Sequence, residues 1–204
     1  MSFSPIPGVQ WGRLVAHADD RGSFRELWRA SAFDALVPAA AGLPPDQAVR
    51  FAQSNLSVSA TGVLRGLHLH LRQLDHWIVA SGRAYVALVD VRPMLAGGAR
   101  PLVDAREVDV NTTVSIPTGV AHGFLAVEPL ELIYFVTNEY DGADELGFAW
   151  DDPDAAVPWP SLPSTPDGRP ILSDRDLGNP SLVELVRRIR GPAGAGPPGE
   201  SAGG

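Results

Sequence analysis

Short runs of alternating or β-branched residues, separated by turns rich in glycine and proline, recur along this chain and constrain its fold most. The 204 residues include 21 glycines and 19 prolines, so turn signals are frequent. Runs of this kind lie at residues 53–58, 76–80, 84–91, 105–110, 113–116 and 130–136. Many short strands with regular turns are typical of a β-sandwich or a closed barrel rather than of βαβ units. We therefore expect an all-β fold.

Helical patterns are restricted to two stretches, at residues 31–36 and 181–190. In the second, Asn179 is the expected N-cap, Pro180 takes the first helical position and arginines fill the last turn. The pattern predicts a short C-terminal helix. The tail that follows consists mainly of glycine, proline and alanine, which cannot bury enough apolar surface to fold, so we expect it to be disordered.

The length of the chain suits one domain with a sizeable core. No linker or internal repeat precedes the tail, so we expect one domain over residues 1–190 and a disordered tail over 191–204. No apolar run approaches the roughly 20 residues that a membrane-spanning helix needs. The first residues also lack the basic and apolar regions of a secretory signal. These features predict a cytoplasmic protein that does not associate with membranes.

Charge and residue usage exclude several classes of chemistry. The net charge of −8 disfavours nucleic-acid binding, because phosphate backbones attract basic surfaces. All 16 cationic side chains are arginines, and the chain has no cysteine. The sequence therefore excludes lysine Schiff bases and thiolate nucleophiles. Arginine favours planar, bidentate contacts with phosphate, so a few local arginines are expected to hold any anionic ligand.

The five histidines are unevenly spaced, and three of them, His68, His70 and His76, fall within nine residues. On a strand, His68 and His70 would lie on one face, because side chains alternate with period two. Glycine and proline surround both His68 and His122, which favours a functional role for these two. We interpret His17 and His76 as ordinary surface or core histidines.

One chemistry for these histidines is metal binding. Two groups of residues match the spacing of the two cupin motifs: Gly62, His68, His70, Asp75 and Gly82, and then Pro117, Gly119 and His122. Aspartate replaces the usual glutamate of the first motif, and Ala126 replaces the asparagine that closes the second. Three histidines and a carboxylate suit a first-row divalent metal. This alternative predicts a metal cupin with His68, His70, Asp75 and His122 as ligands.

A second chemistry is metal-free proton transfer, and it follows from a resemblance that covers the chain to about residue 182. The segments that carry it lie at residues 19–26, 53–55, 62–68, 121–124, 134–140, 150–154 and 171–176. In order and spacing they resemble the dTDP-4-dehydrorhamnose 3,5-epimerase family. The resemblance implies a double-stranded β-helix (a cupin or jelly-roll barrel), a homodimer whose N-terminal segment crosses to the partner barrel, and no cofactor or metal.

The resemblance also implies a role for individual residues. His68 matches the catalytic base, Asp176 the carboxylate that orients it, and Tyr134 the acid on the opposite face of the sugar ring. The implied ligand is a dTDP-linked keto-sugar, and Tyr140 matches the aromatic residue that stacks on thymine. The implied substrate-binding residues are Arg21, Glu26, Gln53, Asn55, Arg65, His122, Tyr140, Glu145 and Arg175.

Structural roles are the alternative for several of these positions. Arg21 and Glu26 could form a solvated pair on a hairpin, and Tyr134 could be a core aromatic residue. We interpret Asp151, Asp152 and Asp154 as turn residues and Trp150 and Trp159 as packing residues.

The chain departs from the family at one position, where a lysine is usual and Asp75 stands instead. The resemblance implies that this lysine stabilises negative charge on the ketone oxygen during enolate formation, and a carboxylate reverses the local charge. His70, His76 or Arg72 could compensate. The favoured hypothesis is an epimerase of a dTDP-4-keto-6-deoxysugar that acts at C3, C5 or both. The alternatives are a keto-sugar isomerase, suggested by His-x-His beside Arg65, and the metal cupin.

Overall fold

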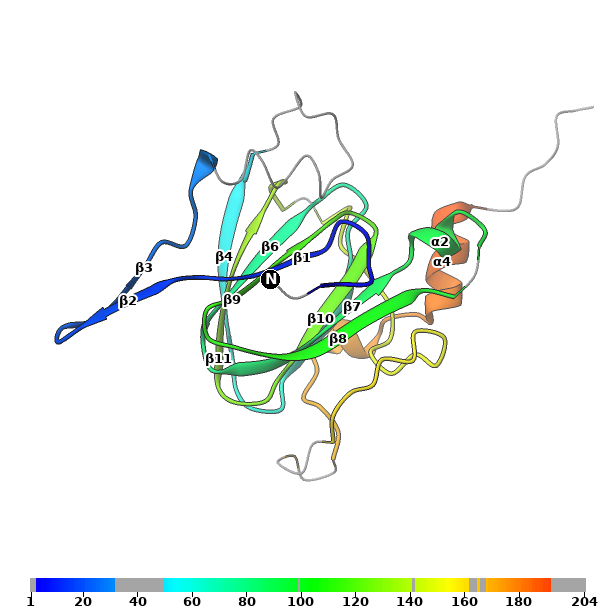
Figure 1. Ribbon diagram of the computed structural model, residues 1–204. Coiled ribbons are helices and arrows are strands. Elements are labelled where there is room, and N and C mark those ends of the chain that lie inside the picture. The colour runs from blue at the N-terminus through cyan, green and yellow to red at the C-terminus, as the bar shows by residue number, and fades with distance from the viewer. Residues whose placement is uncertain are drawn as a thin grey trace, which may run out of the picture.

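The computed structural model describes residues 3–31, 50–98, 100–140, 142–161, 165 and 168–191. Its main body consists of two five-stranded antiparallel sheets that face each other (Figure 1). The predicted all-β, double-stranded β-helix fold is thereby confirmed. The expected helix at 31–36 and the expected disordered tail at 191–204 lie outside the described residues, each apart from its first residue, so the domain boundaries stay predictions.

The two sheets take strands from distant parts of the chain. The first sheet has the order β1 (Gln10–Arg13), β9 (Thr112–Ile116), β6 (Asp75–Ser81), β11 (Leu130–Val136) and β4 (Gln53–Ser59). The second has the order β12 (Leu146–Gly147), β5 (Leu64–Leu69), β10 (Val120–Ala126), β7 (Arg83–Asp90) and β8 (Leu102–Asp109). All six predicted strands are present. The predicted runs leave out four strands of the two sheets, β1, β5, β10 and β12. Strand β10 is buried at every position and therefore does not alternate.

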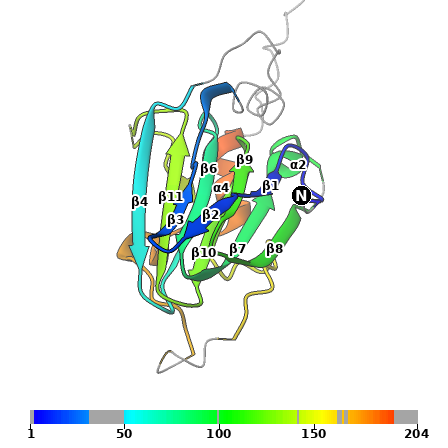
Figure 2. The ribbon, with the colours of Figure 1, turned by 60° about the vertical axis from the view of Figure 1, so that its left-hand side comes forward.

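The core has two parts because the second sheet is covered on both faces. Between the sheets, Trp77, Leu88, Phe124 and Leu132 belong to one buried cluster. On the outer face of the second sheet, Leu67, Leu69, Ala121, Phe148 and Leu185 belong to another. Leu185 lies on helix α4 (Leu182–Arg190), which lies behind the strands in Figure 2. Burial on both faces explains the apolar character of β10.

The N-cap of the C-terminal helix lies two residues later than the sequence predicts. Ser181, not Asn179, is the N-cap, and its Oγ accepts a hydrogen bond from the Glu184 N–H. The Pro180 carbonyl is occupied by the Ala149 N–H at 2.8 Å, which holds this segment outside the helix. The Asp152 carboxylate accepts hydrogen bonds from the N–H groups of Asp154 and Leu182, so its predicted role as a turn residue is confirmed.

Two further helices were not predicted, α2 (Arg92–Leu95) and α3 (Asp174–Leu177), each of a single turn. Within the described residues, no helix is long and apolar enough to cross a membrane.

The predicted packing role of the two tryptophans is confirmed, because Trp159 Nε1 donates to the Trp150 carbonyl at 2.8 Å and the rings lie 6.4 Å apart. A hairpin of β2 (Ala16–Asp19) and β3 (Gly22–Arg25) extends away from the barrel (Figure 1).

The turn between β6 and β7 depends on Gly82, which has a φ of +79°. A Cβ atom there would lie 2.0 Å from the Pro129 carbonyl oxygen. We expect Gly82→Ala to lower the free energy of unfolding by about 3 kcal/mol, from left-handed strain together with the clash. Urea unfolding measures this. Gly191→Ala is the control, because that site has a φ of +72° with no atom within 4 Å, and about 1 kcal/mol is expected. Equal losses would contradict the predicted clash.

Candidate active site

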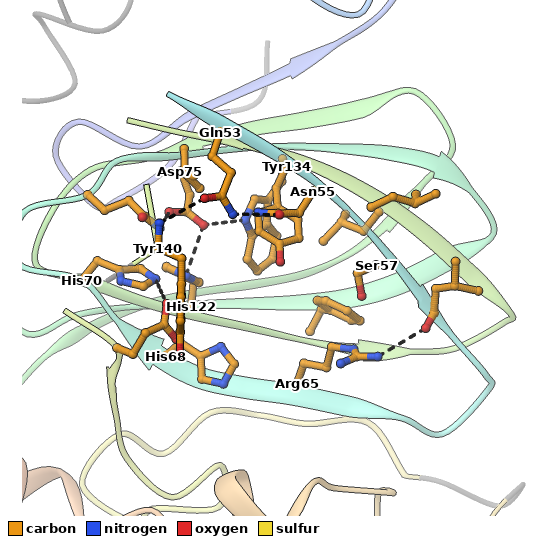
Figure 3. Close-up of a pocket in the computed structure, with 18 of the residues that line it drawn as sticks. Gln53, Asn55, Ser57, Arg65, His68, His70, Asp75, His122, Tyr134 and Tyr140 are labelled. Carbon is orange, nitrogen blue, oxygen red and sulfur yellow. Dashed lines mark hydrogen bonds and ion pairs between the residues drawn. The ribbon is translucent and has the colours of Figure 1, made fainter. Parts of the chain in front are cut away.

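A cavity of about 620 Å³ lies between the two sheets and is lined by strands of both (Figure 3). Side chains of β4, β6 and β11 face those of β5 and β10 across it. Nine of the twelve predicted site residues line this cavity: Gln53, Asn55, Arg65, His68, His122, Tyr134, Tyr140, Glu145 and Arg175.

The partly buried His68 and the buried Asp176 form a pair at one wall of the cavity. His68 Nε2 lies 2.8 Å from Asp176 Oδ1, although the two residues are 108 positions apart. Burial alone would raise the pKa of the Asp176 carboxyl, but hydrogen bonds from His68 and the Gly66 N–H outweigh it and hold this pKa below its usual value. The ionised carboxylate only accepts hydrogen bonds, so the proton sits on His68 Nε2. His68 Nδ1 therefore keeps a free lone pair and can act as a base.

Tyr134 lies in the opposite sheet, on β11, and its side chain enters the same cavity across from His68 (Figure 3). Burial raises the pKa of the Tyr134 phenol above its ordinary value, and the negative charges of Asp75 and Glu145 raise it further. The hydroxyl therefore stays protonated at neutral pH. The cavity thus presents a base on one wall and a proton donor on the facing wall.

Polar side chains hold the mouth of the cavity in a fixed arrangement. Gln53 Nε2 donates to Asn55 Oδ1 at 2.9 Å, and Gln53 Oε1 accepts from the backbone N–H of Tyr140 at 3.0 Å. The Arg65 guanidinium donates to Ser59 Oγ at 3.1 Å, and Arg175 pairs with Glu145 at 2.7 Å. Two arginines therefore stand at a cavity large enough for a small ligand, as binding of an anionic group requires.

The floor of the cavity carries Asp75, whose side chain is buried. Its carboxylate accepts hydrogen bonds from Gln73 Nε2 at 2.8 Å and Trp77 Nε1 at 3.1 Å. The ligand atoms of Asp75, His70 and His122 lie within 4.8 Å of one another, so these three residues could hold a metal ion. His68 does not belong to this group.

Three residues were expected to compensate for the negative charge of Asp75, and they lie in different places. Of His70, His76 and Arg72, His70 lines the cavity, whereas the other two do not. His76 Nδ1 contacts Ser115 Oγ at 2.9 Å, and burial lowers the pKa of His76 to about 4, so it is a neutral core histidine as predicted. His17 is exposed on the β2–β3 hairpin, also as predicted.

Comparison with known proteins now decides the family. A sequence model described as dTDP-4-dehydrorhamnose 3,5-epimerase matches residues 4–184, which is most of the chain. The chain belongs to this epimerase family. A spore coat polysaccharide biosynthesis protein of Bacillus subtilis is 34% identical over 158 residues, covering 76% of this chain and 96% of the relative. The dTDP-4-dehydrorhamnose 3,5-epimerase of Escherichia coli is 33% identical over 173 residues, covering 83% and 86% respectively.

Solved structures of the epimerase family agree with the fold described above. The crystal structure of a 3′-monoepimerase from Streptomyces bikiniensis, in complex with dTDP-quinovose, matches with a TM-score of 0.76 and 29% identity. The match covers 93% of this chain and 91% of that chain. The barrel and its cavity therefore belong to an architecture for which a complex with a dTDP-linked sugar is known.

Arg21 and Glu26 do not reach the cavity of their own chain, unlike the other predicted binding residues. Arg21 pairs with Asp19 at 2.6 Å and Glu26 with Arg29 at 2.6 Å, and all four side chains are at least half exposed. Within one chain, Arg21 and Glu26 therefore form solvated surface pairs, which is the alternative considered for them from the sequence. Their predicted role in substrate binding requires another chain of the epimerase to bring them to a site.

Some cavity residues were not identified from the sequence. Ser57 continues the inward-facing series of Gln53 and Asn55 on β4, so period two could have found it. Gln73 lies in a loop and Trp77 has an apolar side chain, so neither carries a sequence signal for a site beside Asp75.

Proposed function

We propose that this chain is an isomerase that epimerises a dTDP-4-keto-6-deoxysugar at C3, C5 or both, in deoxysugar biosynthesis. The observation that carries the proposal is the placement of the His68–Asp176 pair and Tyr134 on facing walls of one cavity. Membership of the epimerase family supports the same reaction.

The proposed mechanism transfers one proton out of the sugar and another into it. His68 Nδ1 removes the proton from the carbon next to the ketone, and the C–H electrons move into an enolate whose charge lies on the ketone oxygen. The Asp176 carboxylate stabilises the imidazolium that results. The Tyr134 hydroxyl then donates its proton to the same carbon from the opposite face, which inverts the configuration. Solvent returns the proton to Tyr134 and removes the one on His68.

The two arginines at the mouth are the proposed contacts for the pyrophosphate. Charge-assisted hydrogen bonds contribute about 1.5–3 kcal/mol. We therefore expect Arg65→Ala to weaken dTDP binding roughly 10-fold to 100-fold, measured by calorimetry. Arg83→Ala is the matched control, because Arg83 pairs with Glu107 and Glu128 outside the cavity. Equal weakening in both variants would assign the effect to net charge rather than to contact with the pyrophosphate.

The experiment that tests the proposed function is proton NMR of the protein with dTDP-4-keto-6-deoxyglucose in deuterated water. Loss of the C3 signal, the C5 signal or both is expected, and it identifies the carbons that react. A protein that binds dTDP yet leaves both signals intact would overturn the proposed reaction for this sugar.

A keto-sugar isomerase is the second candidate, because His68 and His70 of the His-x-His sequence both line the cavity. An isomerase moves the carbonyl group to a neighbouring carbon, whereas an epimerase leaves it in place. Carbon NMR of the same reaction mixture therefore separates the two activities.

We also propose that the protein acts as a homodimer in which the β2–β3 hairpin or the segment after it reaches the partner's cavity. The hairpin extends from the barrel (Figures 1 and 2) and exposes Phe24. Strand β4 is the edge of the first sheet and exposes Leu56 and Val58, so apolar surface is available for a partner chain.

A mixed dimer tests whether Arg21 acts in the partner's site. One subunit carries Arg21→Ala and the other His68→Ala. If Arg21 completes the neighbouring site, one of the two sites is intact and roughly half of the activity is expected. If Arg21 acts within its own chain or not at all, the mixture has no more activity than its components predict. Sedimentation of the wild type as a monomer would contradict the dimer itself.

The cytoplasmic location and the lack of nucleic-acid binding stay predictions from the sequence. Cell fractionation and a mobility-shift assay with DNA and RNA would test them.

A further inference from the structure

The floor of the cavity gathers three potential metal ligands from different parts of the barrel. His70 follows β5, Asp75 begins β6 and His122 lies on β10. All three side chains are buried and line the cavity, and their ligand atoms lie within 4.8 Å of one another. Figure 3 shows His70, Asp75 and His122 close together on the left-hand side of the pocket.

Both imidazoles are held in the tautomer that leaves Nε2 able to bind a metal. His70 Nδ1 lies 2.8 Å from the Asp144 carbonyl oxygen, and His122 Nδ1 lies 3.2 Å from that of Val120. A carbonyl oxygen only accepts, so each Nδ1 carries a hydrogen, and Nε2 is the ring nitrogen left to bind a metal. Histidines that bind metals commonly donate their other N–H in this way.

Neither Nε2 atom has a hydrogen-bond partner in the described part of the chain. His122 Nε2 lies 3.6 Å from Asp75 Oδ2, and His70 Nε2 lies 4.0 Å from Glu145 Oε1. Both distances exceed the 2.7–3.2 Å that is usual for a hydrogen bond. Two buried lone pairs therefore face the cavity together with a carboxylate.

Asp75 keeps acceptor capacity for a further partner. Each of its oxygens accepts one N–H, from Gln73 and from Trp77, and a carboxylate oxygen has two lone pairs. No arginine pairs with Asp75 among the described residues. Burial of a carboxylate without a cation is costly, and a bound metal would remove that cost.

We propose that His70, Asp75 and His122 bind a first-row divalent metal ion, whose charge offsets that of the buried Asp75 carboxylate. Metal–ligand bonds of about 2.0–2.2 Å put neighbouring ligand atoms roughly 3–3.5 Å apart, so small side-chain movements close the observed separations. Two histidines and one carboxylate leave coordination positions open toward the cavity. His68 lies outside this group of ligand atoms.

The catalytic role of this metal site rests on the proposed epimerase function. When His68 takes the proton, negative charge moves to the ketone oxygen, and Asp75 alone would repel it. Asp75 and Tyr134 lie on the same inward face of the first sheet, because Tyr134 pairs with Trp77 and Val136 with Asp75. A metal ion held by Asp75 would supply positive charge beside the position where the enolate forms.

Metal binding is tested on the full-length protein after chelator treatment, by titration with Co²⁺ and recording of its visible absorption. One Co²⁺ per chain is expected, and both Asp75→Asn and His70→Gln should lower the affinity at least about 10-fold to 100-fold. His17→Ala is the matched control for surface histidines and should bind as the wild type does. Circular dichroism verifies that the variants fold. Absence of stoichiometric Co²⁺ binding, or equal binding by Asp75→Asn and the wild type, would overturn the site.

The catalytic role is tested separately with Asp75→Lys, which replaces the carboxylate and its bound metal ion with a fixed positive charge. This variant should lose Co²⁺ binding and catalyse deuterium exchange whether or not chelator is present, whereas exchange by the wild type should require added metal. Wild-type exchange that is equally fast with chelator would overturn the catalytic role and leave the epimerase proposal intact. Stoichiometric metal binding without any exchange would support the site and contradict the epimerase proposal.

Discussion

His68→Ala is expected to lower the rate of deuterium incorporation into dTDP-4-keto-6-deoxyglucose by about 10³-fold, because general base catalysis typically contributes this order of magnitude. His68 is the histidine in the cavity whose Nε2–H is fixed by a buried carboxylate, and its Nδ1 is the proposed proton acceptor. The measurement is the initial rate of loss of the C3 and C5 proton signals. Binding of dTDP should persist, since the arginines at the mouth are unchanged.

Asp176→Asn also tests the assignment of His68 as the base, because Asp176 holds the ring in the required tautomer. An amide NH₂ can donate to His68 Nε2, which would put the ring hydrogen on Nδ1 and remove the base. A loss of about 10²-fold or more is therefore expected with little change in volume. His17→Ala is the control and should keep the wild-type rate. Wild-type exchange in His68→Ala would assign the base to another residue.

The barrel is predictable from the sequence because its strands are short alternating or β-branched runs that turns rich in glycine and proline separate. Strand β4 alternates for six residues, and its inward positions Gln53 and Asn55 are polar because they face the cavity. Strand β10 did not stand out, because its residues are buried at every position and do not alternate, whereas the buried strand β7 contains several β-branched valines. The start of α4 was misplaced because both Asn179 and Ser181 are suitable caps, and tertiary contacts of Pro180 and Leu182 decide between them.

The chemistry of the site could be predicted from the sequence only in part. The position of His68 and His70 on one face follows from period two, and Leu67 and Leu69 pack on the other face. The pairing of His68 with Asp176 joins distant segments and came from the family resemblance, not from spacing. The tautomers of His70 and His122 depend on backbone carbonyl groups, which have no signature in the residue types.

Tyr134→Phe is expected to separate proton removal from inversion. His68 can still remove the proton and return deuterium to the same face, so exchange should continue. The inverted product should form about 10²-fold more slowly, because no hydroxyl remains on the opposite wall. NMR coupling constants of the deuterated sugar report its configuration, so both rates come from one time course. Tyr85→Phe is the matched control, because Tyr85 packs against Trp159 outside the cavity.

The three possible outcomes assign three different roles to the Tyr134 hydroxyl. Exchange with retained configuration identifies it as the acid that completes inversion. Equal loss of exchange and inversion would instead mean that the hydroxyl stabilises the enolate, because formation of the enolate precedes both. Inversion at the wild-type rate would move the acid to another cavity residue. Since the pKa of Tyr134 lies above its ordinary value, wild-type inversion should not decline through ionisation of this phenol below about pH 10, and a decline at lower pH would point to a different acid.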